Sequence, residues 1–379
     1  MTKIIRGFPL FTVGDLQFDS LDLKVAILSR GINVDEEIYS AFERNYRLSR
    51  HPRSCNTMLL NGEVSVSLAR TDLATPFRLV VSDGRPVITH NGRFVTEIEF
   101  PRQTLFYEQK TSNGIPFGDL AVIQGWDMLA FACLWLCDIA QSGRPCGFCH
   151  TGQLSAPEHT VSDMIEIIRY AVENDPQTKI LQMTAGSTFS PETEIDRYVE
   201  ILKAIDRETG LSKVPTIIYL TPPSDMRRLD RLFDAGVDQI ACDMDIWDEA
   251  LFTKICPGKA QFTTRQRYLD ALLYIAERFG RNRACCVFVA GLEPVESLIE
   301  GETFLAEHGI VPLPSPLMPF GISGKLLNET SAADIDYFRI VKRETAKLYN
   351  KHQLIVPGTY GSDVCLSRDI WLRREMLAN

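Results

Sequence analysis

The sequence predicts an α/β fold, in which a partial (βα)6 TIM-like barrel is joined to a small N-terminal α+β domain. Beyond about residue 125, six apolar runs of strand length alternate with amphipathic segments of helix length. The first third instead alternates apolar and polar residues between turn signals. The chain has 379 residues, 45% of them hydrophobic, which suffices for a large core. Successive βα units imply one parallel sheet, open or curled into a partial barrel.

Residues 1–125 are expected to form the α+β accessory domain. The stretch VSVSLARTDLATPFRLVVSDGRPVITHNGRFVTEIEF contains turn signals at Ser82-Asp83-Gly84 and at Asn91-Gly92. The alternating runs between these turns are typical of antiparallel strands. We expect the barrel in residues 126–325 and a C-terminal helical extension and tail in residues 326–379.

The predicted barrel strands are the runs FACLWLC, KILQMTA, PTIIYLT, DQIACDMD, ACCVFVAG and IVPLPSPLMP. The helical candidates between them include VSDMIEIIRYAVEN, ETEIDRYVEILKAIDRET, DMRRLDRLFDAG and RQRYLDALLYIAERFG, and Gly236 ends the third. In folds of this kind, ligands bind at the carboxyl ends of the strands. The candidate functional residues are therefore those that follow each run.

Net charge and cysteine content narrow the classes of function that the chain could have. The net charge of −9 and the lack of a basic stretch argue against binding to nucleic acid or to an anionic membrane. No run approaches the roughly 20 apolar residues of a membrane span, and the N-terminus lacks the apolar core of a secretion signal, so we expect a cytoplasmic protein. Ten cysteines in such a protein favour metal or redox chemistry over a disulfide framework.

Three cysteines, Cys137, Cys146 and Cys149, lie in FACLWLCDIAQSGRPCGFCHTG, at the end of the first predicted strand. Thiolates suit zinc or iron–sulfur clusters, and three of them can hold three irons of a cubane and leave the fourth open. The alternative is a zinc site with Cys133 as the fourth ligand. Structural zinc sites more often show two separated C-x2-C pairs, whereas this chain has one, and Cys133 lies in an apolar run typical of core packing. We favour the cluster.

The spacing C-x8-C-x2-C, with Phe148 before the last cysteine, resembles the cluster loop of the radical S-adenosylmethionine (radical SAM) superfamily, whose commonest spacing is C-x3-C-x2-C. The pattern that includes PGKA and ERFGRNRACCVFVAGLEP is most similar to the biotin synthase-like group. The resemblance extends over most of residues 125–325. It implies a [4Fe–4S] cluster and SAM as cofactors.

The resemblance also implies which residues contact SAM. The turn in MTAGST would bring small residues to the amino group of SAM, although an ordinary βα turn would look the same. The fifth strand would pack on adenine, with a glycine that lets the backbone approach. The implied cofactor-binding residues are Phe148, Thr184, Ala185, Gly186, Ser187, Asp243, Asp245, Val289, Gly291 and Glu293.

Asp243 and Asp245 follow the fourth predicted strand. Side chains two apart on a strand share a face, so both carboxylates would point into the barrel together. Buried carboxylates need polar partners, and a ribose diol or a polar substrate would provide them. The alternative is that one or both cap the next helix.

The resemblance implies an enzyme that reductively cleaves SAM at the cluster to a 5′-deoxyadenosyl radical and abstracts hydrogen from a small-molecule metabolite. The outcome would be rearrangement, cleavage or carbon–carbon bond formation, with an electron donor such as flavodoxin or ferredoxin. Sulfur insertion or methyl transfer is an alternative, and a non-catalytic zinc or iron–sulfur protein is another. We expect one cluster, because Cys242 would face away from Asp243 and no three cysteines outside the loop form a compact motif. No catalytic base is identified, since His150 is expected to pack or hydrogen-bond near the loop.

Overall fold

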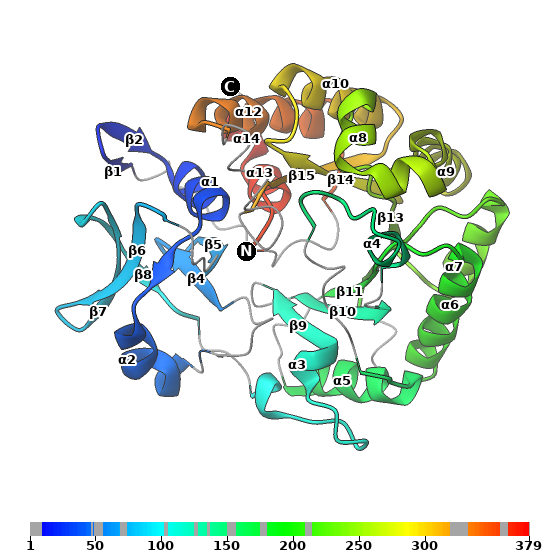
Figure 1. Ribbon diagram of the computed structural model, residues 1–379, viewed down its shortest axis with the longest axis horizontal. Coiled ribbons are helices and arrows are strands. Elements are labelled where there is room, and N and C mark those ends of the chain that lie inside the picture. Colours follow the sequence, from blue (N-terminus) through cyan, green and yellow to red (C-terminus); the bar gives the residue numbers. More distant parts are fainter. Residues whose placement is uncertain are drawn as a thin grey trace.

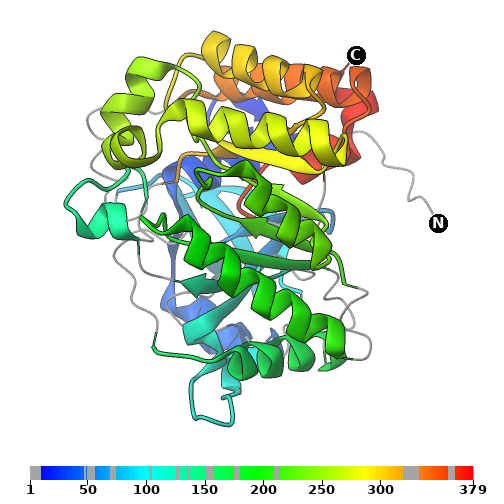
Figure 2. The same ribbon diagram turned by 90° about the vertical axis from the view of Figure 1, so that its right-hand side faces the viewer.

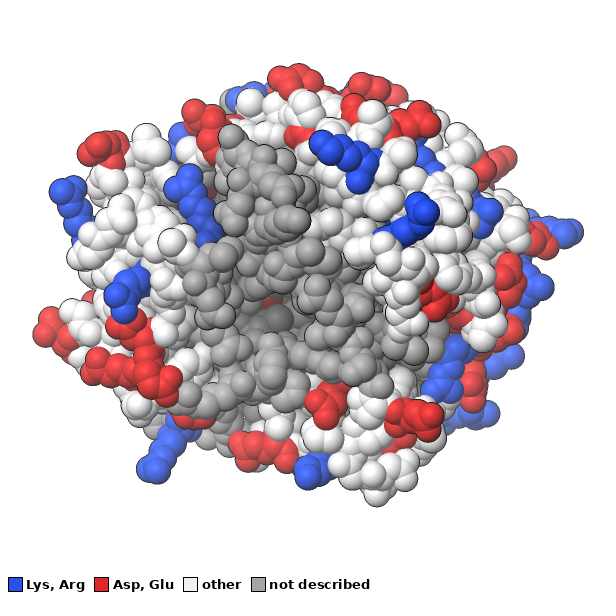
Figure 3. Space-filling view, in the orientation of Figure 1, with Lys and Arg blue, Asp and Glu red and all other residues white. Residues whose placement is uncertain are grey.

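The computed structural model describes residues 10–46, 48, 56–68, 74–101, 105–124, 128–134, 137–149, 157–174, 180–208, 214–318, 333–356 and 363–378. Within these ranges the chain forms a seven-stranded sheet, a six-stranded sheet and a two-stranded ribbon (Figure 1). No helix in them is both long enough and apolar enough to cross a membrane. On the described rim of the face in Figure 3, acidic and basic side chains are interspersed.

The seven-stranded sheet is the predicted barrel. Its strands, in spatial order, are β15 (Val311–Pro316), β14 (Ala284–Ala290), β13 (Gln239–Ala241), β12 (Thr216–Tyr219), β11 (Ile180–Ala185), β10 (Met128–Leu134) and β9 (Ala121–Gln124). The strands from β10 to β15 are parallel and follow chain order, whereas β9 pairs antiparallel with β10. Each of the six predicted runs therefore contributes a strand, and the partial (βα)6 barrel is confirmed.

Helices cover the outer side of this sheet (Figures 1 and 2). They are α5 (Val161–Asn174), α6 (Pro191–Arg207), α7 (Asp230–Asp234), α8 (Glu249–Ile255), α9 (Arg265–Phe279) and α10 (Val295–Glu307), with the short helices η4 (Met226–Leu229) and η5 (Lys259–Thr263). The short helix α4 (Asp138–Gln141) lies in the loop after β10. In α5 the buried residues Met164, Ile167, Ile168 and Ala171 follow the helical period, which is why this segment packs as an amphipathic helix.

The N-terminal part is α+β, as predicted. Its elements are β1 (Phe11–Val13), β2 (Leu16–Phe18), α1 (Ser20–Arg30), β3 (Asn33–Val34), α2 (Glu36–Tyr46), β4 (Thr57–Leu60), β5 (Val64–Ser67), β6 (Phe77–Ser82), β7 (Arg85–His90) and β8 (Arg93–Glu99), followed by η1 (Phe106–Glu108) and α3 (Phe117–Leu120). The sheet order is β3-β6-β7-β8-β4-β5. The turns at Asp83-Gly84 and Asn91-Gly92 have positive φ at both residues, as two-residue hairpin turns require.

The C-terminal residues join the two sheets. They form α12 (Ile335–Lys351), α13 (Ser367–Leu372) and α14 (Arg374–Leu377). Residues 363–366 run beside β15, where the amide of Leu366 donates to the carbonyl of Pro314 at 3.2 Å. On their other side, the amide of Ser67 in β5 donates to the carbonyl of Asp363 at 3.0 Å. This segment therefore lies between the barrel edge and the N-terminal sheet.

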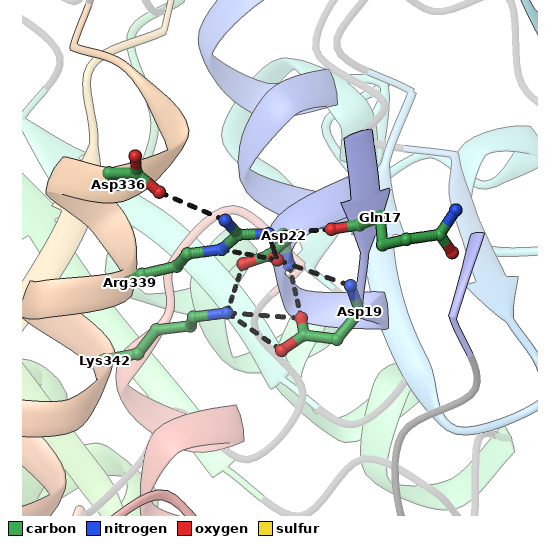
Figure 4. A network of polar contacts seen from close by, with 6 residues as sticks. All are labelled: Gln17, Asp19, Asp22, Asp336, Arg339 and Lys342. Atoms are coloured by element: carbon green, nitrogen blue, oxygen red, sulfur yellow. Dashed lines mark hydrogen bonds and ion pairs between the residues drawn. The ribbon is translucent and has the colours of Figure 1, made fainter. Parts of the chain in front are cut away.

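Ion pairs join α1 to the C-terminal helices (Figure 4). Lys342 of α12 binds the carboxylates of Asp19 and Asp22, and Arg339 binds Asp22 at 2.9 Å and the carbonyl of Gln17 at 2.7 Å. Arg339 also pairs with Asp336. This network packs the N-terminal part directly on α12. The boundary at residue 125 stays a prediction, and β9 already belongs to the barrel sheet.

Candidate functional site

The cysteine loop follows β10. That strand ends at Leu134, so the expectation that Cys137 ends the strand is wrong: Cys137 lies outside it, as the residue before α4. Cys146 is buried, and Cys137 and Cys149 are half-buried. Burial raises the pKa of the Cys137 thiol, and the nearby Cys146 adds to that rise. Two of the three predicted ligands are therefore brought close together.

The donor set of this loop suits a cubane. Zinc ligands converge on one ion, whereas each cysteine of a [4Fe–4S] cluster binds a different iron. Across the described ranges, no three Cys, His, Asp or Glu side chains converge as the ligands of one metal ion would. Three thiols spread over one loop at the carboxyl end of a strand fit the cluster. The side chain of Cys133, the fourth ligand in the zinc alternative, lies outside the described residues, as does His150.

The turn after β11 is held against the cysteine loop by Asp138. The amide of Asp138 donates to the carbonyl of Ser187 at 2.9 Å. Its carboxylate accepts hydrogen bonds from the Thr188 hydroxyl at 3.0 Å and from the Phe189 amide at 2.8 Å. Thr184 and Ala185 are the last residues of β11, and Gly186 is buried. The predicted SAM turn and the predicted ligand loop are therefore adjacent. The sequence analysis missed Asp138, although an acidic residue directly after a candidate ligand was a usable signal.

A shallow pocket of about 180 Å³ opens beyond this turn. Its rim carries the exposed rings of Phe189 and Phe262, whose centroids are 4.6 Å apart. The complete lining is Thr188, Phe189, Pro191, Thr221, Phe262, Thr263 and Arg267. The pocket therefore lies between the β11 turn and η5.

Asp243 and Asp245 are positioned differently from the prediction. Because β13 ends at Ala241, the rule that side chains two apart share a strand face does not apply to them. Asp245 has a φ of 69° and bridges to β14, with its amide donating to the Val287 carbonyl at 3.1 Å. The alternative that they cap the next helix is wrong, since Asp248 caps α8 by accepting from the Leu251 amide.

Both aspartates nevertheless contact Lys259, which is buried together with Asp245, whereas Asp243 is half-buried. Asp245 forms an ion pair with the Lys259 ammonium, which also donates to the carbonyl of Asp243 at 2.7 Å. Asp243 accepts from the Val287 amide at 2.9 Å. Burial, together with the charge of Asp245, raises the pKa of Asp243 to about 7. Asp243 can therefore gain or lose a proton near neutral pH.

The end of α8 and the segment after it contact the cysteine loop. The amide of Gly147 donates to the carbonyl of Ile255 at 2.8 Å. Cys256, at the end of α8, is the main reason that the pKa of Cys146 is lowered. Lys259 lies near Cys146 and lowers its pKa further. The sequence analysis missed Cys256 and Lys259, although both flank the Pro257-Gly258 step of the PGKA segment.

Glu293, one of the predicted cofactor-binding residues on and after β14, accepts hydrogen bonds from three groups of the protein itself. Its carboxylate accepts from the amides of Trp247 and Asp248, both at 2.9 Å, and from the Ser297 hydroxyl at 2.6 Å. These bonds fix the chain just before α8. Gly291, with a φ of 107°, donates its amide to the Tyr337 hydroxyl.

Val289 is buried, and Phe148 is half-buried against the core. Contacts of SAM with Phe148 and with the predicted residues after β11, β13 and β14 stay predictions.

Three further cysteines, one after β13 and two on β14, are buried. Cys242, Cys285 and Cys286 have no exposed surface, and the Cys286 sulfur accepts from the Met244 amide. Because Cys242 also follows the end of β13, strand alternation does not fix which way it faces relative to Asp243. The single-cluster expectation therefore stays a prediction.

Part of the chain matches a known protein family. Residues 142–298 match the family model described as the Radical SAM superfamily, a range that contains Cys146 and Cys149 but not Cys137. A curated relative is the bacteriochlorophyllide c C-7(1)-hydroxylase of Chlorobaculum limnaeum, which is 22% identical over 356 residues, or 88% of this chain and 86% of that protein.

Similar solved structures were also found. One is the [FeFe]-hydrogenase maturase HydG, with 16% identity and a TM-score of 0.45, which covers 61% of this chain and 51% of that one. Another is a radical SAM methyltransferase from Sphaerobacter thermophilus, with 15% identity and a TM-score of 0.43, which covers 77% of this chain and 81% of that one. The chain thus spans about half the length of the HydG maturase.

The family match falls on the barrel, and its range includes most of the cysteine loop and the supporting segment after α8. Residues 142–298 therefore carry a radical SAM domain, and enzymes of that superfamily use SAM and a [4Fe–4S] cluster.

Proposed function

We propose that this radical SAM enzyme abstracts a hydrogen atom from a C–H bond of a small-molecule metabolite, leading to rearrangement, cleavage or carbon–carbon bond formation. The observation that carries the proposal is the contact of Asp138 with Thr188 and Phe189, which joins the cysteine loop to the β11 turn. A ligand held by the loop would therefore lie beside that turn, at the carboxyl end of the barrel sheet.

In this proposal Cys137, Cys146 and Cys149 hold the cluster, which leaves one iron for SAM. When bound, the cluster supplies the electron that cleaves SAM. The residues of the chain position the two cofactors and exclude water from them. Asp243 and Asp245, which follow β13, are the proposed contacts to SAM or to a polar substrate.

The proposed substrate is a small molecule, and bacteriochlorophyllide c is the first compound to test. The hydroxylase named for that compound aligns with 88% of this chain, at 22% identity. The proposed reductant is a flavodoxin or a ferredoxin. The proposed compartment is the cytoplasm, where ten cysteines would stay reduced.

The test begins with anaerobic purification and measurement of iron, sulfide and visible absorption. About four irons per chain are expected for one cubane. Reduced protein incubated with SAM should then release 5′-deoxyadenosine, and C146A should release none. A colourless protein that contains zinc would contradict the proposal. Deuterium transfer from labelled candidate substrates into 5′-deoxyadenosine then identifies the substrate.

A further inference from the structure

A buried acidic residue of α6 lies behind the turn that follows β11. Glu194 is only 1% exposed, and no lysine or arginine pairs with it in the part of the chain that the structure describes. A buried acidic group without a counter-charge is costly unless it is neutral and hydrogen-bonded. The hydrogen bonds of Glu194 therefore decide what this residue does.

Two side chains of α6 hold the end of β12. The Thr221 amide donates to the Glu194 carboxyl group at 3.1 Å, and the Tyr198 hydroxyl donates to the Tyr219 carbonyl at 2.8 Å. Residues four apart lie on the same face of a helix, which is why both side chains reach one strand end. Since β12 ends at Tyr219, Glu194 fixes the chain directly after this strand.

From Thr221 the contacts continue to the cysteine loop. The Thr188 amide donates to the Thr221 hydroxyl at 3.1 Å, and the Thr188 hydroxyl donates to the Asp138 carboxylate at 3.0 Å. Asp138 directly follows Cys137 in the chain. One series of contacts therefore joins α6, the residues after β12, the turn after β11 and the cysteine loop. Thr188 and Thr221 also line the shallow pocket.

The Glu194 carboxyl group can make its contact in the neutral form. Burial raises the pKa of Glu194 to about 8. The oxygen of a neutral glutamine accepts a hydrogen bond as a carboxyl oxygen does. A glutamine at this position should therefore keep the contact, whereas an alanine leaves the buried Thr221 amide without an acceptor.

We propose that Glu194 is a positioning residue for SAM, which holds Thr221 and thereby sets the place of Thr188 and its turn. The inference rests on the proposed function, in which this turn meets SAM. Glu194 has almost no exposed surface, so its effect passes through Thr221 and Thr188. Loss of its acceptor oxygen should lower SAM affinity beyond any effect on stability.

Equilibrium dialysis measures the SAM affinity of reconstituted wild type, E194A and E194Q, and the melting temperature of each is recorded. E194A should bind SAM about tenfold more weakly, as expected for the loss of one hydrogen bond, whereas E194Q should stay within about twofold of wild type.

E302A is the matched control. Glu302 is a fully buried carboxyl group on another barrel helix, α10, and burial raises its pKa likewise to about 8. Its partner is the Thr345 hydroxyl of α12. E302A should therefore lower the melting temperature as E194A does and leave SAM affinity unchanged.

T221V tests the next contact of the series and keeps the proposal testable if E194A does not fold. Valine keeps the size of the side chain and the backbone amide, but it removes the acceptor of the Thr188 amide. T221V should weaken SAM binding to a similar extent as E194A. The double variant E194A/T221V should bind no more weakly than either single variant, because both break the same series of contacts.

The results separate the two levels of the argument. Wild-type protein that binds no SAM would overturn the proposed function itself. Wild-type affinity in E194A or in T221V would overturn this inference alone, as would equal losses in E194A and E302A or in E194A and E194Q. A loss in E194A and T221V, with recovery in E194Q, supports it.

Discussion

Asp138 and Thr188 join the first two βα units at the candidate site: the Thr188 hydroxyl donates to the Asp138 carboxylate at 3.0 Å. The same carboxylate oxygen accepts from the Phe189 amide. One acidic side chain thereby sets the distance between the cysteine loop and the turn that is proposed to meet SAM. Its removal should affect ligand binding more than it affects folding.

The D138A variant should bind SAM more weakly and lose iron faster than wild type. Each hydrogen bond to a carboxylate contributes roughly 1.5–3 kcal/mol, and two are lost. SAM affinity can be measured by equilibrium dialysis on the reconstituted protein. D225A removes an exposed carboxylate that pairs with Arg227, and it should behave as wild type. Wild-type SAM affinity in D138A would refute the positioning role.

Each of C137A, C146A and C149A should abolish cluster binding, whereas C133A should retain it. Three thiolates are needed to hold a cubane that keeps an open iron, so any single loss leaves too few ligands. Iron per chain after reconstitution should fall from about four to below one in the three loop variants. Complete loss of iron in C133A would show that the site has four protein ligands.

A methyl group at Gly258 should displace the cysteine loop. In G258A the new Cβ would meet both the Arg144 carbonyl and, at 2.7 Å, the Cβ of Ile139. We expect reduced iron retention with a melting temperature lowered by several degrees, because overpacking a buried contact costs about 1–3 kcal/mol. G143N is the control in the same loop, where no atom lies within 4 Å of the added Cβ and asparagine tolerates positive φ. Equal iron retention in G258A and wild type would contradict the proposed support.

Amide substitution of the two aspartates after β13 should lower the free energy of unfolding by different amounts. D245N leaves the buried Lys259 without its counter-charge and should cost about 3–5 kcal/mol in urea unfolding. D243N should cost much less, since Asp243 is already partly neutral near pH 7 and an amide oxygen can accept from the Val287 amide. The double variant D245N/K259M should recover part of the loss. Equal destabilisation by both single variants would argue against this assignment.

Glu302 of α10 should make the protein less stable as pH rises. Its carboxyl group is fully buried, receives one hydrogen bond from Thr345, and has its pKa raised by burial from 4.5 to about 8. Between these values the folded chain holds a proton that the unfolded chain has released. The free energy of unfolding therefore falls by about 1.4 kcal/mol per pH unit from this group.

E302Q should remove that contribution, so its stability relative to wild type should increase from pH 5 to pH 8. Urea unfolding at several pH values measures the difference between the two proteins. E296Q, at an exposed position on the same helix, should keep the wild-type dependence. A constant difference between E302Q and wild type across this range would exclude the buried neutral carboxyl.

The barrel could be predicted from the sequence because its parallel strands are short, mainly apolar runs, of which β14 is buried on both faces. The hairpin turns could be predicted because Asp83-Gly84 and Asn91-Gly92 favour the positive φ angles that they adopt. The cysteine loop could be predicted because its residues are local in the chain. These features depend on neighbours in sequence.

The rest of the site depends on distant residues. The hydrogen bond of Gly147 with Ile255 joins segments from different βα units, and no periodicity in the sequence indicates it. β13 is only three residues long and ends before Asp245, which has a positive φ. The rule that side chains alternate between the two faces of a strand therefore does not hold for Asp245. Glu293 resembles a cofactor contact in sequence, yet its partners are the amides before α8.

The ion pairs of α1 also determine when the chain can fold during synthesis. The buried partners of Asp22 and Lys24 lie 320 and 345 residues further along the chain, in α12 and α13. At about 5–20 residues per second, a ribosome needs roughly 20–70 s to reach them. Until then α1 carries charges that it cannot bury, so the N-terminal sheet cannot complete its packing until nearly the whole chain has emerged. A nascent chain stalled before residue 342 should therefore remain bound to chaperones.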